Sequence, residues 1–417
     1  MYLYMARTVM KIPPSLCLKC RGGSMLCGLS YCPIQVKLTM KSVSTKLTGN
    51  SFSGSSPPGI FVGRYGYPNI KLYPSAPPEH GDTGSYENPH EWLNMPMEQF
   101  LSMRLSMARG SVSVKVSDAV SPDRLYQEIQ AMALSGKSVD VEMDFEKQLS
   151  GGDAILDEHV PPMGPSAPIK KIEIGNSAPK RSVDRVHSDT DMKAMDAMDY
   201  LYKSGIDVYE ISKILSVGAI GEGKARKAVP TRWSITAADK NVSDLLVDKV
   251  KDLPQIDKYY AYVRKTPGNL FMGILVPWVW IYEWGEAWFP GSTWNQWSTD
   301  SFVEIDHEDY NGRKTYPGIG GCYYSTRLSV AEKFLEMGRS GGAITWREIY
   351  PGFNLPVGVW YVRENMRQLF NVKPEVFDTL EDAVAYITQF MLVDPPRWKE
   401  KSYVIPSLKY NNLWRFM

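Results

Sequence analysis

The 417-residue sequence has almost no net charge, because 47 Lys and Arg residues are balanced by 46 Asp and Glu residues, which leaves +1. A global basic field for nucleic acid is therefore excluded, and any such contact must come from a local patch. The longest apolar run, 270–282, is interrupted by Gly273 and Pro277 and is too short to cross a bilayer. Residues 1–10 lack the pattern of a secretory signal, so we expect a cytoplasmic protein with no membrane partner.

The sequence also lacks the common motifs of nucleotide and hydrolytic chemistry. It has no P-loop, no G-x-G-x-x-G, no H-E-x-x-H and no G-x-S-x-G. These absences argue against an ATP-driven motor or a kinase. No repeat period is present, so a solenoid is excluded. A chain of this length exceeds what one hydrophobic core usually supports, and two or three units are expected.

Hydrophobic periodicity predicts strands and helices that are mixed without a regular βαβ order, which favours an α+β fold with mixed sheets and packed helices. The predicted strands are 33–40, 60–62, 111–116, 139–145, 169–174, 259–263, 270–276, 279–284, 301–309 and 341–346. The predicted helices are 96–109, 122–135, 191–204, 207–217, 241–250, 328–338, 357–370 and 380–390. Residues 47–59 are rich in Ser, Gly and Pro and are predicted to form a loop, and no ordered element is predicted after Pro395 and Pro396.

Only five cysteines occur, and four of them lie within sixteen residues in a C-x2-C-x6-C-x4-C pattern: Cys17, Cys20, Cys27 and Cys32. Four thiolates so close in sequence predict a small metal-binding knuckle at residues 1–40, with structural zinc as the expected ion. An iron–sulfur cluster is the alternative metal group. Two disulfides or four ordinary thiols are the other interpretations. Lys19 and Arg21 beside the cysteines are candidate phosphate contacts.

An acidic group on a predicted strand is the best candidate by residue type for metal-assisted or general acid/base chemistry. Its members are Glu304, Asp306, His307, Glu308 and Asp309. The competing interpretation is a solvated strand edge or turn.

Two further clusters are candidate nucleic-acid or ligand contacts. Arg64, Asp82 and His90 lie in Gly- and Pro-rich loops, where binding residues are common, although Asp82 fits a turn equally well. A basic stretch ends at Trp233, which suggests phosphate contacts with a stacking ring, or else a solvated loop beside a buried Trp. Its basic residues are Lys224, Arg226, Lys227 and Arg232.

The last residues are apolar and aromatic, and Leu413 and Phe416 are three positions apart. In a 3₁₀ turn these two side chains project together. Such a peptide docks either into the protein's own core or into a partner's groove.

Several segments together resemble the archaeal Nre family (NreA type), over nearly the whole chain and in the same order. They are Cys17–Gly22, Cys27–Gly28, Tyr31–Pro33, Phe61–Pro68, Gly81–Thr83 and Val229–Thr236. The resemblance implies a DNA damage repair protein with an Nre N-terminal region at 41–300 and an Nre C-terminal region at 301–405. DNA is the expected nucleic acid, although zinc knuckles and basic–aromatic loops serve RNA as well.

The resemblance also implies that residues 406–417 bind the sliding clamp PCNA. The family's clamp peptide reads Gln, two residues, an aliphatic residue, two residues and two aromatic residues. Here Leu413 and Phe416 match, whereas Tyr410 replaces the Gln and Met417 the second aromatic residue. We therefore expect weakened clamp binding. No catalytic mechanism is implied, so an enzyme acting on nucleic acid or nucleotides through Arg64, Asp82, Arg232 or the Glu304–Asp309 group is the alternative.

Overall fold

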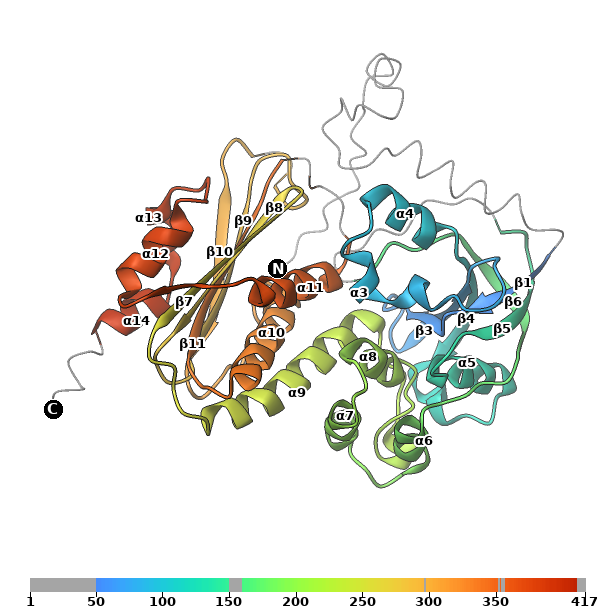
Figure 1. Cartoon of the computed structure of the whole chain (residues 1–417). Helices are drawn as coiled ribbons and strands as arrows, with labels where there is room; N and C mark the ends of the chain where they lie inside the picture. The colour runs from blue at the N-terminus through green and yellow to red at the C-terminus, as the bar shows by residue number, and fades with distance from the viewer. Residues whose placement is uncertain (1–49, 150–159, 296–297, 352, 354–356, 411–417) are drawn as a thin grey trace, which may run out of the picture.

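A computed structural model describes residues 50–149, 160–295, 298–351, 353 and 357–410. It confirms the α+β class, because two six-stranded sheets of mixed strand direction are packed with helices. Figure 1 shows the sheets in two bodies that lie side by side, with helices between them. The second sheet takes strands from both sides of residue 300. The four clustered cysteines and residues 411–417 lie outside the described part of the chain.

The first sheet has the order β1-β5-β6-β4-β3-β2, and only its β4–β6 pair is parallel. Its strands are β1 (Ser51–Ser56), β2 (Gly59–Val62), β3 (Asn69–Ala76), β4 (Ala108–Lys115), β5 (Val139–Phe145) and β6 (Ser166–Ile174). In β5 every second residue is buried, as the alternating sequence VDVEMDF predicts. These buried residues pack with Tyr126, Ile129 and Met132 of helix α5 (Arg124–Leu134). One face of this sheet and helix α5 therefore enclose a hydrophobic core.

The second sheet has the order β10-β9-β11-β8-β7-β12, and only its β9–β11 pair is parallel. Its strands are β7 (Tyr259–Thr266), β8 (Asn269–Val276), β9 (Tyr282–Trp288), β10 (Phe302–Glu308), β11 (Gly342–Ile349) and β12 (Glu375–Phe377). Every residue of β8 is buried, because helices cover both faces of the sheet. A strand with two covered faces reads as a continuous apolar run, which explains why 270–276 is so hydrophobic.

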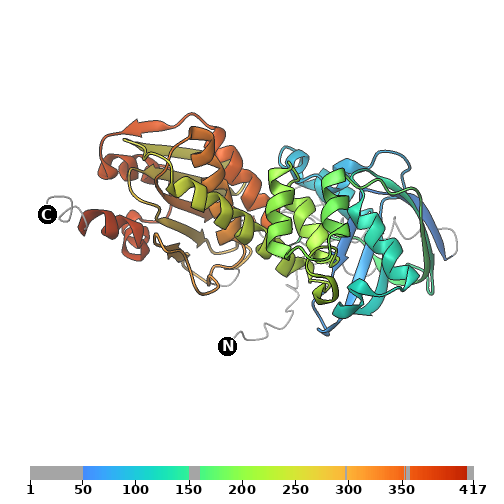
Figure 2. The same ribbon diagram turned by 90° about the horizontal axis from the view of Figure 1, so that it is seen from below.

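Two sets of helices cover the second sheet. On one face lie α10 (Cys322–Met337) and α11 (Val359–Asn371). On the other face lie α12 (Leu380–Thr388), α13 (Pro395–Lys401) and α14 (Val404–Tyr410), which pack on the sheet through buried residues such as Trp398 and Leu408. Figure 2 shows the sheet between the two sets.

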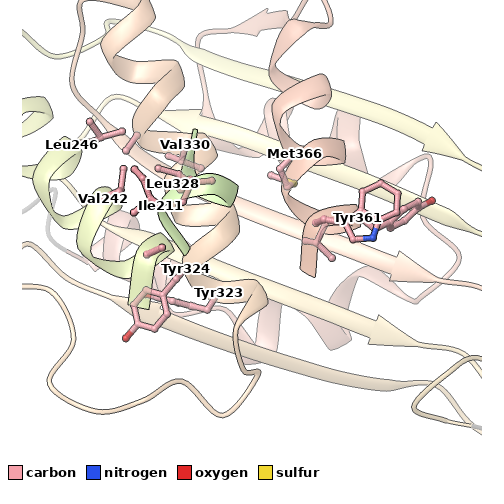
Figure 3. Close-up of a cluster of buried hydrophobic side chains, with 14 of the residues drawn as sticks. Ile211, Val242, Leu246, Tyr323, Tyr324, Leu328, Val330, Tyr361 and Met366 are labelled. Carbon is pink, nitrogen blue, oxygen red and sulfur yellow. The ribbon is translucent and has the colours of Figure 1, made fainter. Parts of the chain in front are cut away.

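A helical layer joins the two bodies. It contains α6 (Arg181–Ser188), α7 (Ala194–Lys203), α8 (Val208–Ser216) and the 21-residue α9 (Thr231–Lys251). Figure 3 shows how their apolar side chains meet those of the second body: Ile211 of α8 and Val242 and Leu246 of α9 lie among the side chains of α10 and α11. The largest core of the described residues is therefore shared between the bodies.

Most predicted elements are confirmed, and the misses have physical causes. Residues 51–56 form β1 although they read as a loop, because their serines pair with β5: Ser51 Oγ donates to Asp144 and Ser55 Oγ to Asp140. Helix α9 starts ten residues earlier than predicted, within the basic segment. Residues 395–401 and 404–410 form α13 and α14, where no element was predicted.

The remaining short elements lie in the first body and are η1 (Gly84–Glu87), α3 (Pro89–Trp92), α4 (Met97–Leu105), η2 (Val116–Val120) and η3 (Gly223–Ala225). None of the helices in the described ranges is both long enough and apolar enough to cross a membrane.

Candidate functional site

A cavity of about 900 Å³ lies where the first sheet, the helical layer and α11 meet. Its walls come from segments far apart in sequence: Pro57–Phe61, His80–Gly84, Ser135–Ser138, Val160–Met163, Asp207–Ser216 and Trp360–Arg363. The volume is that of a site for a nucleotide-sized ligand. Apolar side chains such as Ile60, Phe61 and Ile235 line the cavity together with polar side chains from α8. This mixture of surfaces is typical of binding sites.

His90 of α3 links three elements at one side of the cavity. Its Nδ1 lies 2.9 Å from Glu364 Oε2 of α11, and its Nε2 lies 3.0 Å from Asp207 Oδ2, at the N-cap of α8. Hydrogen bonds to these two carboxylates raise the pKa of His90 to about 10, against the effect of burial. Burial alone would raise the pKa of Asp207, but the hydrogen bond to His90 and the charge of Arg367 lower it to about 2. His90 is therefore a charged link between the bodies.

Arg363 and Asp239 form a buried ion pair beneath the same region. Arg363 Nε donates to Asp239 Oδ1 at 3.0 Å, and its guanidinium lies 4.5 Å from the centre of the Tyr209 ring. Both side chains are almost fully buried, so each needs the other to remain charged there. The pair connects α9 to α11, and Arg363 also contributes to the cavity wall.

Lys213 of α8 differs from Lys180 and Arg104 of the same cavity in having no partner for its charge in the described part of the chain. Among the described residues no hydrogen bond or ion pair reaches its amine, whereas Lys180 pairs with Glu210 at 2.6 Å and Arg104 with Glu87 at 2.7 Å. Burial lowers the pKa of Lys213, the charges of Glu210 and Glu87 oppose this, and Lys180 adds to it. Sequence reasoning missed this residue, because a Lys on an amphipathic helix looks like any solvated side chain.

Of the residues predicted from loops, Asp82 lines the cavity but is used in a turn. Its Oδ1 accepts from Gly84 N at 3.0 Å and from Ser138 Oγ at 3.3 Å, as the turn interpretation predicts. Arg64 and Arg232 are not among the cavity residues. The cavity therefore does not join Arg64, Asp82 and Arg232.

Instead, the structure brings Arg64 and Arg232 to a surface beside the cavity. Val62 N donates to Thr231 Oγ1 at 2.8 Å, which fixes the end of β2 against the start of α9. The turn after β2 then carries Tyr65 and Tyr67, which are 83% and 52% exposed, and the Tyr67 ring lies 5.2 Å from that of Trp233, itself 45% exposed. We call the five residues Arg64, Tyr65, Tyr67, Arg232 and Trp233 the aromatic–basic surface.

The basic stretch before α9 is only partly available for binding. Lys224 and Lys227 are exposed. Lys227 lies near Tyr67, because the next residue, Ala228, donates to Val116 O, and Val116 N donates to Pro68 O. The interpretation of Arg226 as a nucleic-acid contact is corrected. Its buried guanidinium donates to the carbonyls of Gly221, Val186, His187 and Asp189, so it holds the loop together.

In the acidic group on β10, Glu308 and Asp306 form hydrogen bonds and ion pairs with neighbouring side chains of the fold. Glu308 is buried and accepts from Arg327 Nε at 2.7 Å, from Trp280 Nε1 at 2.7 Å and from the Tyr323 hydroxyl at 3.2 Å. Asp306 pairs with Arg313 at 2.8 Å. No cluster of three or more His, Cys, Asp or Glu side chains that could hold a metal ion exists within the described residues.

Comparisons with known proteins match Nre proteins over nearly the whole chain. Two family models match, "Archaeal Nre, N-terminal" over residues 26–295 and "Archaeal Nre, C-terminal" over residues 308–416. A DNA repair protein NreB of Archaeoglobus fulgidus is 43% identical over 403 residues, which cover 96% of this chain and 100% of that protein.

Two further relatives are more distant. A DNA repair protein NreA of the same organism is 35% identical, over 88% of this chain and 92% of that protein. A DNA repair protein NreA of Haloferax volcanii is 33% identical, over 87% of this chain and 88% of that protein. No solved structure matches the chain. The chain therefore belongs to the archaeal Nre family.

Proposed function

We propose that this protein is a DNA repair factor that holds an unpaired nucleic-acid strand on its aromatic–basic surface. The repair role is supported by its relatives, which are named DNA repair proteins NreA and NreB. The observation that carries the binding role is the exposure of Tyr65, Tyr67 and Trp233, three rings gathered at one surface, whereas most other aromatic side chains in the described part of the chain are not exposed. Exposed rings beside cations are the usual platform for stacking the bases of single strands.

The cations at this surface match the phosphates of such a strand. The Arg64 guanidinium lies 5.2 Å from the centre of the Tyr65 ring, and no ion pair to Arg64 or Lys227 occurs among the described residues. Their charge is therefore available to phosphate groups, whereas the chain as a whole has a net charge of only +1. We expect modest affinity with a shallow salt dependence, because few phosphates are contacted.

Fluorescence anisotropy with a labelled single-stranded oligonucleotide tests the surface. Replacing Tyr65 and Trp233 by Ala is expected to weaken binding at least about tenfold, since each stacked base contributes roughly 1–3 kcal/mol. The matched control is Trp294→Ala, which removes a ring that is 56% exposed in the second body. Equal affinities of wild type and the Tyr65/Trp233 variant would disprove the role of this surface. Competition with RNA of the same sequence at stated salt distinguishes DNA from RNA.

The clamp peptide is a second part of the proposal. The sequence Tyr410, Leu413, Phe416 and Met417 keeps two anchors of a PCNA-binding peptide. Its first residue, Tyr410, is the last residue of α14, whose buried Val404, Ile405 and Leu408 fix the helix to the second body. In a pull-down with the cognate clamp, the Leu413→Ala/Phe416→Ala variant should be lost while Leu392→Ala, an exposed-surface control, is retained. Equal retention of both variants would exclude this role for the tail.

The third part is a metal site at Cys17, Cys20, Cys27 and Cys32. Four thiolates at this spacing support structural zinc, with an iron–sulfur cluster as the other occupant. Elemental analysis of protein purified without chelators should give about one zinc per chain. Less than about half an equivalent of any metal would overturn the four-thiolate interpretation.

A further inference from the structure

The starting observation is the pair of unpartnered polar atoms on the cavity side of α8. No partner among the described residues reaches the Lys213 amine. One turn earlier on the same helix, Glu210 Oε2 binds Lys180, but Glu210 Oε1 is buried without a hydrogen bond. A buried carboxylate oxygen without a hydrogen bond is costly to the fold, whereas the partly exposed side chain of Lys213 is open to the cavity. A ligand that binds the amine and also offers a hydroxyl donor would satisfy both atoms.

The chemistry of Lys213 narrows the class of that ligand. Burial and the nearby charge of Lys180 lower the pKa of the Lys213 amine, and a lowered pKa makes an amine a better nucleophile toward carbonyl carbon. The cavity lining carries both signs of charge, since Arg104, Lys137, Lys180 and Lys213 lie in it beside Asp82, Glu87, Asp140, Asp207 and Glu210, so a phosphate next to the sugar meets cations as well as carboxylates. An aldehyde with neighbouring hydroxyl groups supplies both a carbonyl carbon for the amine and a hydrogen-bond donor for Glu210.

The cavity lies next to the aromatic–basic surface, and this position indicates which aldehyde could reach Lys213. Phe61 lines the cavity, and Arg64 of the aromatic–basic surface is three residues further along, so the two are at most about 11 Å apart along the chain. Thr231 also lines the cavity, while Trp233 of the same helix belongs to the surface. A strand held on the surface can therefore present one nucleotide to the cavity. The aldehyde that DNA damage creates on such a strand is the open-chain sugar of an abasic site.

We propose that Lys213 forms an imine with the C1′ aldehyde of an abasic deoxyribose in this cavity. This inference rests on the proposed binding of a nucleic-acid strand. The neutral amine adds its electron pair to C1′, and a proton passes from nitrogen to the aldehyde oxygen to give a carbinolamine. Loss of that oxygen as water forms the C=N bond, so one amine and one aldehyde give one imine and one water. Glu210 is positioned to accept a hydrogen bond from a sugar hydroxyl during these steps.

Reduction with borohydride tests the proposal, because it converts an imine into a stable amine. We expect the full-length protein to form a covalent adduct with a labelled oligonucleotide that carries one abasic site, and peptide mapping to place the adduct on Lys213. Lys213→Met should reduce the adduct at least tenfold. Lys373→Met removes an exposed lysine of the second body, outside the cavity, and should leave the yield unchanged. The melting temperature of Lys213→Met checks that the variant is folded.

A second arm separates this proposal from strand binding. Deoxyribose 5-phosphate carries the same aldehyde without a strand, and its reductive adduct should also form on Lys213 more readily than on the exposed Lys137. Anisotropy with the abasic oligonucleotide, without reductant, reports strand binding alone. Binding of the strand with no adduct on Lys213 from either aldehyde overturns the imine and leaves the surface proposal intact. An adduct from the free sugar but no strand binding supports the imine and overturns the surface.

Discussion

At the scale of single residues, one imidazole accounts for a large part of the pH response at the junction of the bodies. His90 is hydrogen-bonded to Asp207 and Glu364, and these bonds raise its pKa to about 10. In the unfolded chain the pKa of this histidine is about 6.5. Because the folded value is the higher one, the contribution of His90 to stability is complete below about pH 6.5 and is lost as the pH rises toward 10.

Urea unfolding at a series of pH values tests this role of His90. We expect the free energy of unfolding of the wild type to fall by about 1 kcal/mol more than that of His90→Gln between pH 6.5 and 10, a modest difference because solvent screens a half-exposed ring. Parallel pH profiles of the two proteins would contradict the assignment. Below pH 4, protonation of Asp207 and Glu364 should weaken the same contact, since the pKa of each is lowered in the folded state.

A second residue-scale prediction concerns the buried pair Arg363 and Asp239. Asp239→Ala leaves the guanidinium without its counter-charge and is expected to cost about 3–5 kcal/mol of unfolding free energy. The double variant Asp239→Leu/Arg363→Met removes both charges and should recover much of this loss. Urea denaturation measures both changes. A double variant less stable than Asp239→Ala would show that the ion pair is not the cause.

At the scale of secondary-structure elements, Glu283 of β9 holds α13 and α14 in place. Its carboxylate accepts from Ser402 Oγ at 2.9 Å, from Val404 N at 2.9 Å, from Tyr403 N at 3.0 Å and from Trp346 Nε1 at 3.0 Å. Burial raises the pKa of Glu283, while these donors oppose the shift. The charge of the carboxylate is thus balanced by the first backbone N–H groups of α14.

Glu283→Ala should therefore loosen one edge of the second body. We expect a loss of at least about 3 kcal/mol, because several buried donors lose their acceptor. Hydrogen exchange should speed up in 395–410 and remain slow in α9, which does not contact this carboxylate. Uniform acceleration over the whole chain would point instead to global destabilisation. If the tail binds the clamp, the same variant should also weaken that binding.

The element scale also shows what sequence patterns can and cannot predict. Strand β5 is predicted by alternating apolar and polar residues, because one of its faces is buried. Strand β8 is predicted by a continuous apolar run, because both of its faces are buried. Strand β1 could not be predicted, since its stability comes from serine hydroxyls bonded to aspartates about ninety residues away. The cavity could not be predicted for the same reason, because Lys213 and Phe61 are far apart in sequence and are brought to one cavity only by the tertiary fold. Asp82 could be predicted, because the Gly- and Pro-rich composition of its loop is visible in the local sequence.

At the scale of the whole molecule, the bodies share one apolar core through α8, α9, α10 and α11. Such a core predicts that the bodies unfold together. Far-ultraviolet circular dichroism and tryptophan fluorescence should give coincident urea transitions for the full chain. Two separated transitions would show that the bodies are independent units.

The length of helix α9 sets the distance between the two binding sites proposed for this protein. Its 21 residues span about 30 Å, and it begins at the aromatic–basic surface and continues into the second body. The C-terminal helices lie beyond the second sheet, on the side away from α9 (Figure 1). A clamp held at that end and a strand held at the other would be kept apart by a stiff spacer. The two proposed binding sites would then stay a fixed distance apart, so a strand on the aromatic–basic surface would lie away from the clamp-binding end of the protein.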